Sequence, residues 1–332
     1  MSITLLDVIN GTNGANRLPI AHHATLVYGP PKTGKTELIA TIATSTHFDT
    51  IYWFDTENGV DTLKRMHREG KLTDEQIAKI VYIKLIDTKD APEALNTLLK
   101  SLCTRQPVNI CQVDGLIDSV EGKSKKWPFI KFHYAALNSR CAIVIDSLSQ
   151  VGQSAAALAT QGKPTEYKLQ LDDYGAMGKW LADLLSTIQA AKYCYFFCIS
   201  HEVMFEEEGK SARIVPMCGT KTFSNTVGKY FGTQIYLALK AKKHTAVSTT
   251  TSTSTAQAGS RLGIVLDGQK ELNLGEAMDN ANFFVPDPIT DDEELTELKE
   301  LKDSPVSQVT PAAPEKQSGL SALERLRANK TQ

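Results

Sequence analysis

The 332-residue sequence lacks several features that would each point to a particular class of protein. It has no apolar run long enough to span a membrane, and its first residues, MSITLLD, have neither the basic region nor the apolar core of a signal peptide. Its six cysteines form no C-x-x-C pair and have no histidine at ligand spacing, so neither a zinc site nor a disulfide framework is expected. We therefore expect free thiols, no membrane partner and a cytoplasmic location.

A strong positive charge is also absent, since 36 Lys and Arg stand against 38 Asp and Glu, a formal net charge of −2. Residues 287–332 carry ten acidic and six basic side chains, which leaves 30 basic and 28 acidic side chains on the rest. Residues 1–286 are thus nearly neutral. This excludes a protein that coats nucleic acid through a strongly basic surface, but a local basic groove remains compatible with it.

One segment carries the strongest motif of the chain. Residues 29–36 read GPPKTGKT and match in full the phosphate-binding loop pattern G-x-x-x-x-G-K-[ST]. The apolar residues 24–28 before it predict a short buried strand, and residues 37–43 after it predict the opening of a helix, which is the context that this motif requires. The pattern predicts a site for a nucleoside triphosphate.

Each residue type in this loop has a physical reason. Gly29 and Gly34 allow backbone conformations that turn successive N–H groups toward phosphate oxygens at the start of a helix. Proline carries no N–H, so Pro30 and Pro31 cannot donate to a phosphate. The backbone donors around the phosphate, here called the phosphate cradle, must therefore be the amides of residues 32–36. The Lys35 ammonium is expected to reach the β- and γ-phosphates, and the Thr36 hydroxyl is expected to bind Mg²⁺.

Such a site also needs a carboxylate at the end of a buried strand. Residues 142–145 are apolar and are followed by Asp146, which is expected to support Mg²⁺ through a bound water. A competing segment ends at Asp114, but Gln112 interrupts its apolar run. The expected nucleotide-binding residues are Gly29, Lys32, Thr33, Gly34, Lys35, Thr36 and Asp146, and the expected metal ligands are Thr36 and Asp146.

An acidic pair follows another predicted strand. Asp55 and Glu57 lie at and just beyond the end of residues 51–55, and ligands of open α/β sheets bind at the carboxyl ends of the strands, so both carboxylates are expected to face the γ-phosphate. A carboxylate there can orient and deprotonate the attacking water. The alternative is a helix-capping role, with Glu57 exposed on the surface.

Apolar strands alternate with helical patterns from residue 24 to about 240, which predicts an α/β fold whose mostly parallel central sheet is flanked by helices. Strands are expected over residues 25–28, 51–55, 80–86, 142–146, 193–200 and 233–239. Helices are expected over residues 35–44, 60–68, 92–102, 133–138 and 174–191. A Ser/Thr-rich segment, about 247–259, predicts the flexible tip of a C-terminal hairpin that joins the last strand to residues 262–266.

Four motifs in this order resemble the RecA-type ATPase core over roughly residues 20–240: the phosphate-binding loop, FDTENG at 54–59, IVIDS at 143–147 and YFFCISHE at 195–202. The chain looks most like the compact phage-encoded RecA-core proteins of single-strand annealing and recombination. The resemblance implies an ATPase, with Glu57 as the catalytic glutamate. It also implies that His201, where RecA itself has Gln, senses the γ-phosphate and signals to a mobile DNA-binding loop. An ordinary strand-end residue is the alternative.

The same resemblance implies single-stranded DNA as a partner, in the host cytoplasm if the chain is phage-encoded. Two regions are expected to face DNA, about 150–170 and about 202–218, although the three glutamates at 206–208 disfavour phosphate. An insertion, about 115–131, interleaves basic and aromatic residues as a nucleic-acid contact would, with a solvated loop as the alternative. The candidate DNA contacts are Lys123, Lys125, Lys126, Trp127, Lys163, Lys168, Lys210 and Arg213.

The resemblance also implies a homo-oligomer, either a ring or a filament. RecA-like sites are completed by a basic residue of the neighbouring subunit, which stabilises charge on the transferred phosphoryl group. Lys221 and Lys229 are the candidates for this role in trans, and a helix-surface lysine is the alternative for each.

The composition changes near the C-terminal end. Residues 287–332 combine DDEE with a Pro/Ser-containing linker and the amphipathic LSALERLR, which predicts an acidic disordered tail with a short helix. Such a helix can dock a partner, for example a single-strand-binding or a replication or recombination protein, or it can fray in solvent. The predicted organisation is an N-terminal segment, 1–19, an ATPase core, 20–286, and this tail.

Two other functions fit the phosphate-binding loop. A small-molecule kinase would need an acceptor pocket and usually an arginine-rich lid, and no arginine-dense segment is evident. A non-enzymatic switch or assembly scaffold would bind nucleotide to control partner docking through the C-terminal helix.

Overall fold

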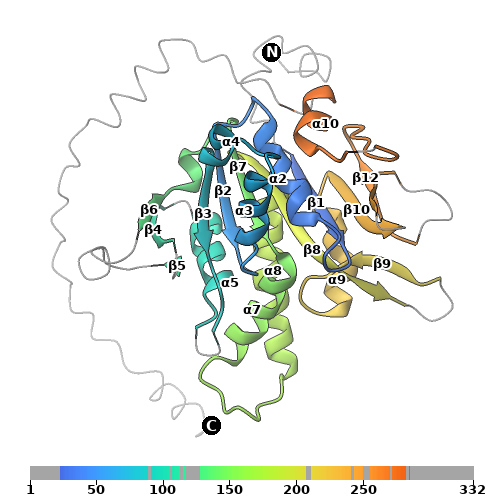
Figure 1. The fold of residues 1–332 in the computed structure, drawn as a ribbon. Coiled ribbons are helices and arrows are strands. Elements are labelled where there is room, and N and C mark those ends of the chain that lie inside the picture. Colours follow the sequence, from blue (N-terminus) through green and yellow to red (C-terminus); the bar gives the residue numbers. More distant parts are fainter. Residues whose placement is uncertain are drawn as a thin grey trace, which may run out of the picture. The chain divides into compact units, whose positions relative to one another are not determined.

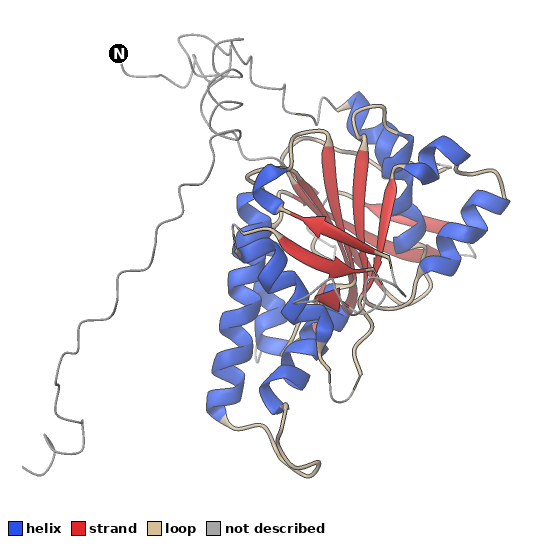
Figure 2. Cartoon of the chain, turned by 90° about the vertical axis from the view of Figure 1, so that its left-hand side faces the viewer, coloured by secondary structure: helices blue, strands red, loops and turns tan. Residues whose placement is uncertain are grey.

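The computed structural model describes residues 23–88, 91–104, 106–112, 115–116, 128–206, 211–240, 243–249, 255–269, 271–281 and 284. Within them, one large sheet lies between helices, and a small second sheet lies beside it (Figures 1 and 2). The strands are β1 (Ala24–Gly29), β2 (Thr50–Asp55), β3 (Ile80–Lys84), β4 (Val108–Cys111), β5 (Gly115–Leu116), β6 (Phe129–Phe132), β7 (Cys141–Asp146), β8 (Tyr195–Phe205), β9 (Arg213–Pro216), β10 (Thr233–Lys240), β11 (Lys243–Val247) and β12 (Gly259–Ser260). The helices are α2 (Lys35–Ala40), α3 (Val60–Arg68), α4 (Asp74–Ala78), α5 (Glu93–Leu98), α7 (Leu148–Thr160), α8 (Leu171–Ala190), α9 (Lys221–Val227) and α10 (Leu274–Asn280).

The large sheet has the strand order β11-β10-β1-β8-β7-β2-β3, with β12 paired to β10 and β9 paired to β8. The six strands from β10 to β3 in this order pair in parallel, whereas β9, β11 and β12 pair antiparallel to their neighbours. Helices cover both faces (Figure 2). The predicted α/β fold with a mainly parallel central sheet is confirmed.

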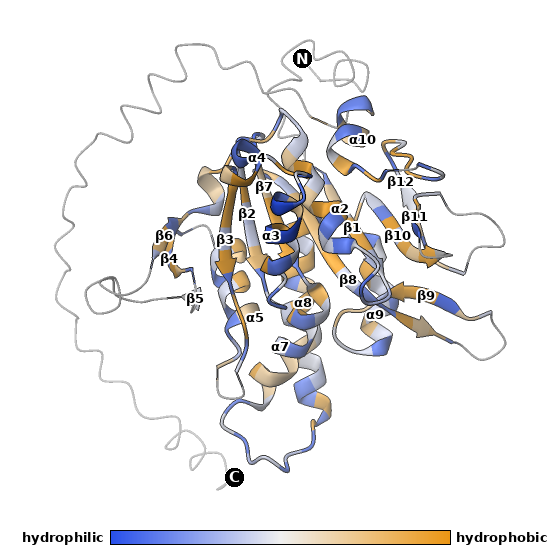
Figure 3. Cartoon of the chain, in the orientation of Figure 1, coloured by the Kyte–Doolittle hydropathy of each residue, from blue (hydrophilic) through white to orange (hydrophobic). Residues whose placement is uncertain are grey.

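Side chains of the central strands alternate between two buried apolar clusters, one on each face of the sheet. In β8, Phe196 and Cys198 belong to the cluster formed with α5, α7 and α8, whereas Tyr195 and Phe197 belong to the cluster formed with α2, α3 and α10. Successive strand side chains point to opposite faces, so a strand buried on both faces is a continuous apolar run. Accordingly, strands such as β3 and β8 are coloured mostly toward the hydrophobic end of the scale in Figure 3.

Two helix expectations are corrected. Residues 133–138 hold only a 3₁₀ turn, Tyr134–Ala136, because the buried Tyr134 ring packs edge-on against Tyr193 and fixes this segment at the edge of the core. Residues 150–160, expected within a DNA-facing loop, belong instead to α7 (Leu148–Thr160). Its first turn is capped by the Ser147 hydroxyl, and its apolar residues, such as Val151 and Ala155, follow helical spacing into the core.

The C-terminal hairpin is present, but its turn lies earlier than expected. The antiparallel partner of β10 is β11, with Lys240 beside Lys243, so the turn does not fall at 247–259. Residues 262–266, expected as the second strand, lack strand pairing and bury Ile264 and Leu266 in the core. The Ser248 hydroxyl accepts the Leu266 N–H and holds this irregular segment in place.

The small sheet, ordered β5-β4-β6, comes from residues in and before the predicted insertion. It is antiparallel, and its Phe132 packs edge-on against Tyr52 and Phe54 of the large sheet. Within the insertion, residues 117–127 lie outside the described residues, and so do residues 1–22 and 285–332. None of the helices in the described part of the chain is both long and apolar enough to cross a bilayer.

Candidate functional site

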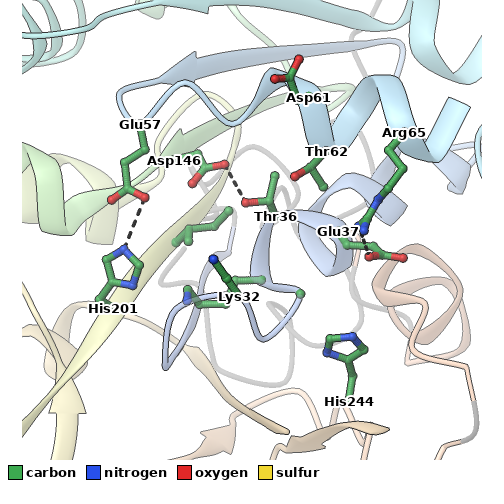
Figure 4. A pocket seen from close by; sticks show the side chains of 13 residues that line it. Lys32, Thr36, Glu37, Glu57, Asp61, Thr62, Arg65, Asp146, His201 and His244 are labelled. Carbon is green, nitrogen blue, oxygen red and sulfur yellow. Dashed lines mark hydrogen bonds and ion pairs between the residues drawn. The ribbon is translucent and has the colours of Figure 1, made fainter. Parts of the chain in front are cut away.

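The carboxyl ends of β1, β2 and β7 and the point where β8 leaves the core bring together residues that are far apart in the sequence. Gly29 of β1 pairs with His201 of β8, and Asp55 of β2 pairs with Asp146 of β7. These ends and the first turns of α2 and α3 surround a pocket of about 560 Å³ (Figure 4). The pocket is lined by the predicted residues Lys32, Gly34, Lys35, Thr36, Glu57, Asp146 and His201, and also by Glu37, Asp61, Thr62, Arg65 and His244.

The phosphate-binding loop between β1 and α2 needs its two glycines. Gly29 has φ +150°, and a Cβ there would lie 2.1 Å from the Leu237 carbonyl oxygen of β10. Gly34 has φ +87° and precedes the first residue of α2. Side chains rarely adopt this left-handed conformation, so glycine is required at both positions. The Thr33 hydroxyl donates to the Pro30 carbonyl at 2.8 Å and closes the loop.

The Lys35 side chain points into this loop. Only 6% of it is exposed, and its ammonium donates to the carbonyl oxygens of Gly29 at 3.0 Å and Pro30 at 2.7 Å. Burial lowers the Lys35 pKa to about 8, against the opposing charges of Glu57 and Asp146. The ammonium is therefore a buried cation held by two neutral carbonyls, and phosphate oxygens would be stronger partners for it.

Thr36 and Asp146 contact each other across the pocket floor. The Thr36 hydroxyl donates to Asp146 Oδ2 at 3.0 Å, and Asp146 is 2% exposed. Burial raises the Asp146 pKa to about 7, and the charges of Asp55 and Glu57 add to this effect. A carboxylate so disfavoured in its charged form is one that a divalent cation would stabilise. This hydroxyl and carboxylate fit Mg²⁺.

A cage of three or more His, Cys, Asp or Glu side chains around a metal is absent from the described part of the chain. That is the arrangement expected for Mg²⁺ in a phosphate-binding site, because Mg²⁺ is usually bound by one or two protein groups, substrate phosphates and water. The donor set offered here is a Thr hydroxyl and a buried carboxylate.

Asp55 has a different role from the one expected of it. It is fully buried and accepts the backbone N–H groups of Glu57 at 3.0 Å and Val60 at 3.2 Å, and the Tyr82 hydroxyl at 2.7 Å. The first N–H groups of a helix have no partner within the helix, and Asp55 supplies one at the start of α3. The expectation that Asp55 faces the γ-phosphate is therefore wrong, and its carboxylate instead shapes the turn that presents Glu57.

Glu57 reaches into the pocket from that turn. Its Oε1 accepts the Ser147 hydroxyl in a short hydrogen bond, and its Oε2 lies 3.3 Å from His201 Nε2. Burial raises the Glu57 pKa, but the hydrogen bonds from His201 and Ser147 and the charge of Lys35 outweigh burial and leave the pKa below its ordinary value. Glu57 is thus an ionised carboxylate beside the pocket at neutral pH.

His201 joins this carboxylate to two other elements. Its backbone N–H donates to the Ser149 hydroxyl of α7 at 2.7 Å. Its carbonyl oxygen accepts, at 2.8 Å, the N–H of Met217, the residue that follows β9. Its ring Nδ1 is buried and has no hydrogen-bond partner among the described residues. The residue lies where β8 leaves the core and continues as an antiparallel ribbon with β9.

The predicted DNA contacts lie away from the pocket where they are described. Lys163 and Lys168 are exposed in the connection between α7 and α8, at the lower end of these helices in Figure 1. The Lys163 ammonium lies 4.5 Å from the ring centre of Tyr167. Arg213 opens β9, with its guanidinium 5.7 Å from the ring centre of Phe205. Lys123, Lys125, Lys126, Trp127 and Lys210 lie outside the described residues.

Neither lysine proposed to act in trans lines the pocket of its own chain. Lys221 is exposed at the first position of α9. Lys229 is exposed near the amino ends of β1 and β10, where it lines a small cavity with Ala24 and Arg261. This is the edge of the sheet opposite the phosphate-binding loop.

Five polar or charged residues that line the pocket were not predicted from the sequence: Glu37, Asp61, Thr62, Arg65 and His244. Arg65 pairs with Glu37 at 2.8 Å, and its spacing of four residues from Asp61 on α3 is a helical signal that would have placed both on one face. His244 lies on β11 with its ring Nδ1 2.7 Å from the Thr33 carbonyl oxygen. The two residues are 211 positions apart, and no local pattern predicts their contact.

Comparison with known proteins places the fold among nucleotide-binding proteins. A family model described as an AAA domain matches residues 22–262. A solved ATPase of the type III secretion system of pathogenic bacteria is similar, with 13% identity, a TM-score of 0.40 and coverage of 66% of this chain and 52%, about half, of that one. No curated protein matches the sequence.

Two further solved structures are similar. The RadB recombinase has 15% identity and a TM-score of 0.35, with 73% of this chain and 84% of that chain covered. The flagellar accessory protein FlaH from Methanocaldococcus jannaschii has 13% identity and a TM-score of 0.33, with 74% and 83% covered. Since the family model matches more than half of the sequence, the chain belongs to the AAA domain family and is a nucleotide-binding P-loop ATPase.

Proposed function

We propose that this protein hydrolyses ATP with Mg²⁺ to regulate its binding of single-stranded DNA, in recombination or strand annealing of the phage type. The observation that carries the proposal is the meeting of Lys35, the Thr36–Asp146 pair and the Glu57–His201 pair around one pocket. A phosphate-binding loop alone would support only nucleotide binding. An ionised carboxylate beside it supports hydrolysis as well.

Glu57 is the proposed general base. It is held by Ser147 through one oxygen and by His201 through the other, so its orientation is fixed before substrate binds. It orients the attacking water and takes its proton as the water oxygen bonds to the γ-phosphorus and the bond from that phosphorus to the β–γ bridging oxygen breaks, so that ADP leaves with the bonding electron pair and phosphate is formed. Lys35 exchanges its two carbonyl partners for phosphate oxygens and stabilises their charge. Bound Mg²⁺, held by Thr36 and supported by Asp146, would neutralise charge on the phosphates.

His201 is the proposed link between hydrolysis and DNA. Its ring contacts the proposed general base, Glu57, and its backbone is hydrogen-bonded to Ser149 at the start of α7 and to Met217 just after β9. A change in the charge or position of Glu57 therefore reaches both α7 and the β8–β9 ribbon through direct contacts. The candidate DNA contacts lie at the far ends of these two elements: Lys163 and Lys168 beyond α7, and Arg213 in the ribbon.

The proposed active form is a homo-oligomer in which a neighbouring subunit contributes Lys221 or Lys229. Both lysines are exposed and lie outside their own chain's pocket, as a residue acting in trans requires. The acidic tail, residues 287–332, lies outside the described residues, and we propose it as the docking segment for a single-strand-binding, replication or recombination protein.

One measurement separates this proposal from other uses of the pocket: ATP hydrolysis with and without single-stranded DNA, across a salt series. We expect turnover that DNA stimulates and that added salt suppresses. Lys35→Ala is the matched control, in which binding of ATP is expected to be lost. Transfer of phosphate to a metabolite would replace the proposal with a kinase. Tight ATP binding without turnover would replace it with a nucleotide-controlled scaffold.

A further inference from the structure

A histidine from the edge of the sheet contacts the backbone of the phosphate-binding loop. The ring Nδ1 of His244 lies 2.7 Å from the carbonyl oxygen of Thr33. A carbonyl oxygen can only accept a hydrogen bond, so Nδ1 carries the proton and donates. The contact is therefore directional, and it is made whether or not Nε2 is protonated.

This hydrogen bond fixes the orientation of one peptide group. A trans peptide is planar, so the N–H of Gly34 points opposite to the carbonyl of Thr33. Holding the carbonyl toward β11 turns the Gly34 N–H away from β11. In Figure 4, His244 lies on one side of the loop, and Thr36, Asp146 and Glu57 lie on the other. The Gly34 N–H is thereby turned toward the side of the loop where phosphate is expected.

The loop needs such support because of its composition. Gly34 adopts φ +87°, and glycine exchanges readily between backbone conformations, so the peptide before it rotates easily when nothing holds it. The residues Pro30 and Pro31 contribute no N–H, so the loss of one amide removes a large share of the donors that remain. A Cβ on Gly34 would lie 3.1 Å from His244 Nδ1, which places the ring directly against this peptide.

The backbone that carries His244 is itself fixed to the same sheet. His244 pairs with Leu239 in the antiparallel ladder between β11 and β10, and β10 pairs in parallel with β1, the strand from which the loop departs. The donor and the loop are therefore tied to one rigid frame. His244 also stands between the nucleotide pocket and a second cavity of about 630 Å³, since it lines both.

We propose that His244 is a positioning residue for the phosphate cradle, whose Nδ1–H holds the Thr33 carbonyl so that the Gly34 N–H faces the phosphate. The inference rests on the proposed binding of ATP in the same pocket. Removing the ring frees the peptide to rotate and weakens ATP binding. Turnover at saturation stays unchanged, because Lys35 and Glu57 are untouched.

The test uses the full chain with three substitutions at this position and measures the Kd of ATP·Mg²⁺ together with kcat and KM. His244→Ala is expected to raise Kd and KM about three- to tenfold, the effect of one hydrogen bond, with kcat within about twofold of the wild type. His244→Asn places an amide N–H near the position of Nδ1 and is expected to restore binding. His244→Gln places it near Nε2 and is expected not to. His67→Asn, at a histidine of α3 that pairs with Asp74, is the matched control.

Several results would overturn the inference: an unchanged Kd in His244→Ala, equal rescue by Asn and Gln, or a fall in kcat with KM unchanged. If the alanine variant does not fold, as judged by its thermal unfolding, the comparison of the Asn and Gln variants decides. If the folded wild type binds no ATP, the proposed function fails and this inference falls with it. Wild-type binding together with unaffected variants would overturn the role of His244 alone.

Discussion

The Oε2 atom of Glu57 lies 3.3 Å from the Nε2 atom of His201, although β2, which precedes Glu57, and β8, which carries His201, are separated in the sheet by β7. Neither residue stands within its strand's buried run: Glu57 follows the end of β2, and His201 is where β8 leaves the core. Their contact joins the proposed chemical step to the proposed DNA-binding elements through a single pair of side chains.

Glu57→Gln is expected to bind ATP with near wild-type affinity and to lose hydrolysis. The amide has the shape of the carboxylate but is not a base, and loss of a general base lowers kcat by about 10²–10⁴-fold. Steady-state phosphate release and equilibrium ATP binding, measured on the same preparation, separate the two effects. Glu69→Gln, an exposed position just after α3, serves as the control, and full turnover in the Glu57 variant would refute the assignment.

ATP affinity is expected to be highest between about pH 7 and about pH 8. Burial lowers the pKa of Lys35 to about 8, so the nucleotide-free protein loses this positive charge as the pH rises through that value. Burial raises the pKa of Asp146 to about 7, so its carboxylate is protonated as the pH falls through that value. Binding of ATP·Mg²⁺ needs both groups charged, so the affinity for ATP falls below about pH 7 and above about pH 8. Titrations of ATP across this range check the expectation.

Asp146→Asn tests the acidic side of this pH dependence. An amide does not titrate, so the variant is expected to bind more weakly throughout and to lose the fall in affinity below about pH 7. The unfolded chain ionises this carboxyl near 3.8, whereas the folded protein keeps it protonated up to about pH 7. The contribution of Asp146 to the free energy of unfolding of the nucleotide-free wild type therefore falls as the pH rises through this range, and the variant lacks this contribution. If the ATP affinity of the variant still fell below about pH 7 as in the wild type, the role of Asp146 would be contradicted.

Gly29→Ala is expected to destabilise the protein by about 3 kcal/mol or more, because its Cβ would lie 2.1 Å from the Leu237 carbonyl oxygen. The matched control is Gly70→Ala. Gly70 also has a positive φ, +71°, but among the described residues no atom beyond its two chain neighbours lies within 4 Å of a Cβ there, so only the conformational cost of about 1–2 kcal/mol is expected. Denaturant unfolding of both variants measures the difference, and equal losses would contradict the argument from close approach.

Replacing Lys163 and Lys168 together by Ala is expected to weaken binding of single-stranded DNA and to flatten its salt dependence. Each phosphate contact on a single strand contributes about 0.7 to the slope of log K against log salt, so the slope is expected to fall by up to about 1.4. Lys192→Ala provides a control at an exposed lysine just before β8. Fluorescence anisotropy at several salt concentrations gives both slopes. If the slope did not change, the segment between α7 and α8 that carries Lys163 and Lys168 would not belong to the proposed DNA-binding surface.

Much of the fold was predictable because the local signals and the global packing agree. The segment 142–145 is apolar without interruption, as a strand buried on both faces must be, and its terminal Asp146 follows at the edge of the sheet. The same logic placed Glu57 just beyond the end of a strand, whereas the phosphate-binding loop motif placed Lys35 and Thr36 at the start of the next helix. Their predicted proximity needed only the rule that parallel strands present their carboxyl ends at one edge.

The remaining features depend on contacts that the local sequence does not encode. His244 was missed because its partner, the Thr33 carbonyl, is a backbone atom 211 residues away. The role of Asp55 was misassigned because an acidic residue at a strand end can face either a ligand or a helix terminus, and only the position of α3 decides. α7 was missed although Ser147 and the apolar spacing after it are an N-terminal helix signal.

The continuity of β8 determines how far the proposed signal from the nucleotide would travel. The strand runs unbroken from Tyr195 in the core, past His201 at the pocket, to Phe205 in the ribbon. It contains no loop in which a displacement at the pocket would dissipate. If β8 tilted at His201, the displacement of its residues would grow with their distance from His201. A small shift at the phosphate would therefore move Phe205 and Arg213, at the end of the ribbon, by a larger distance.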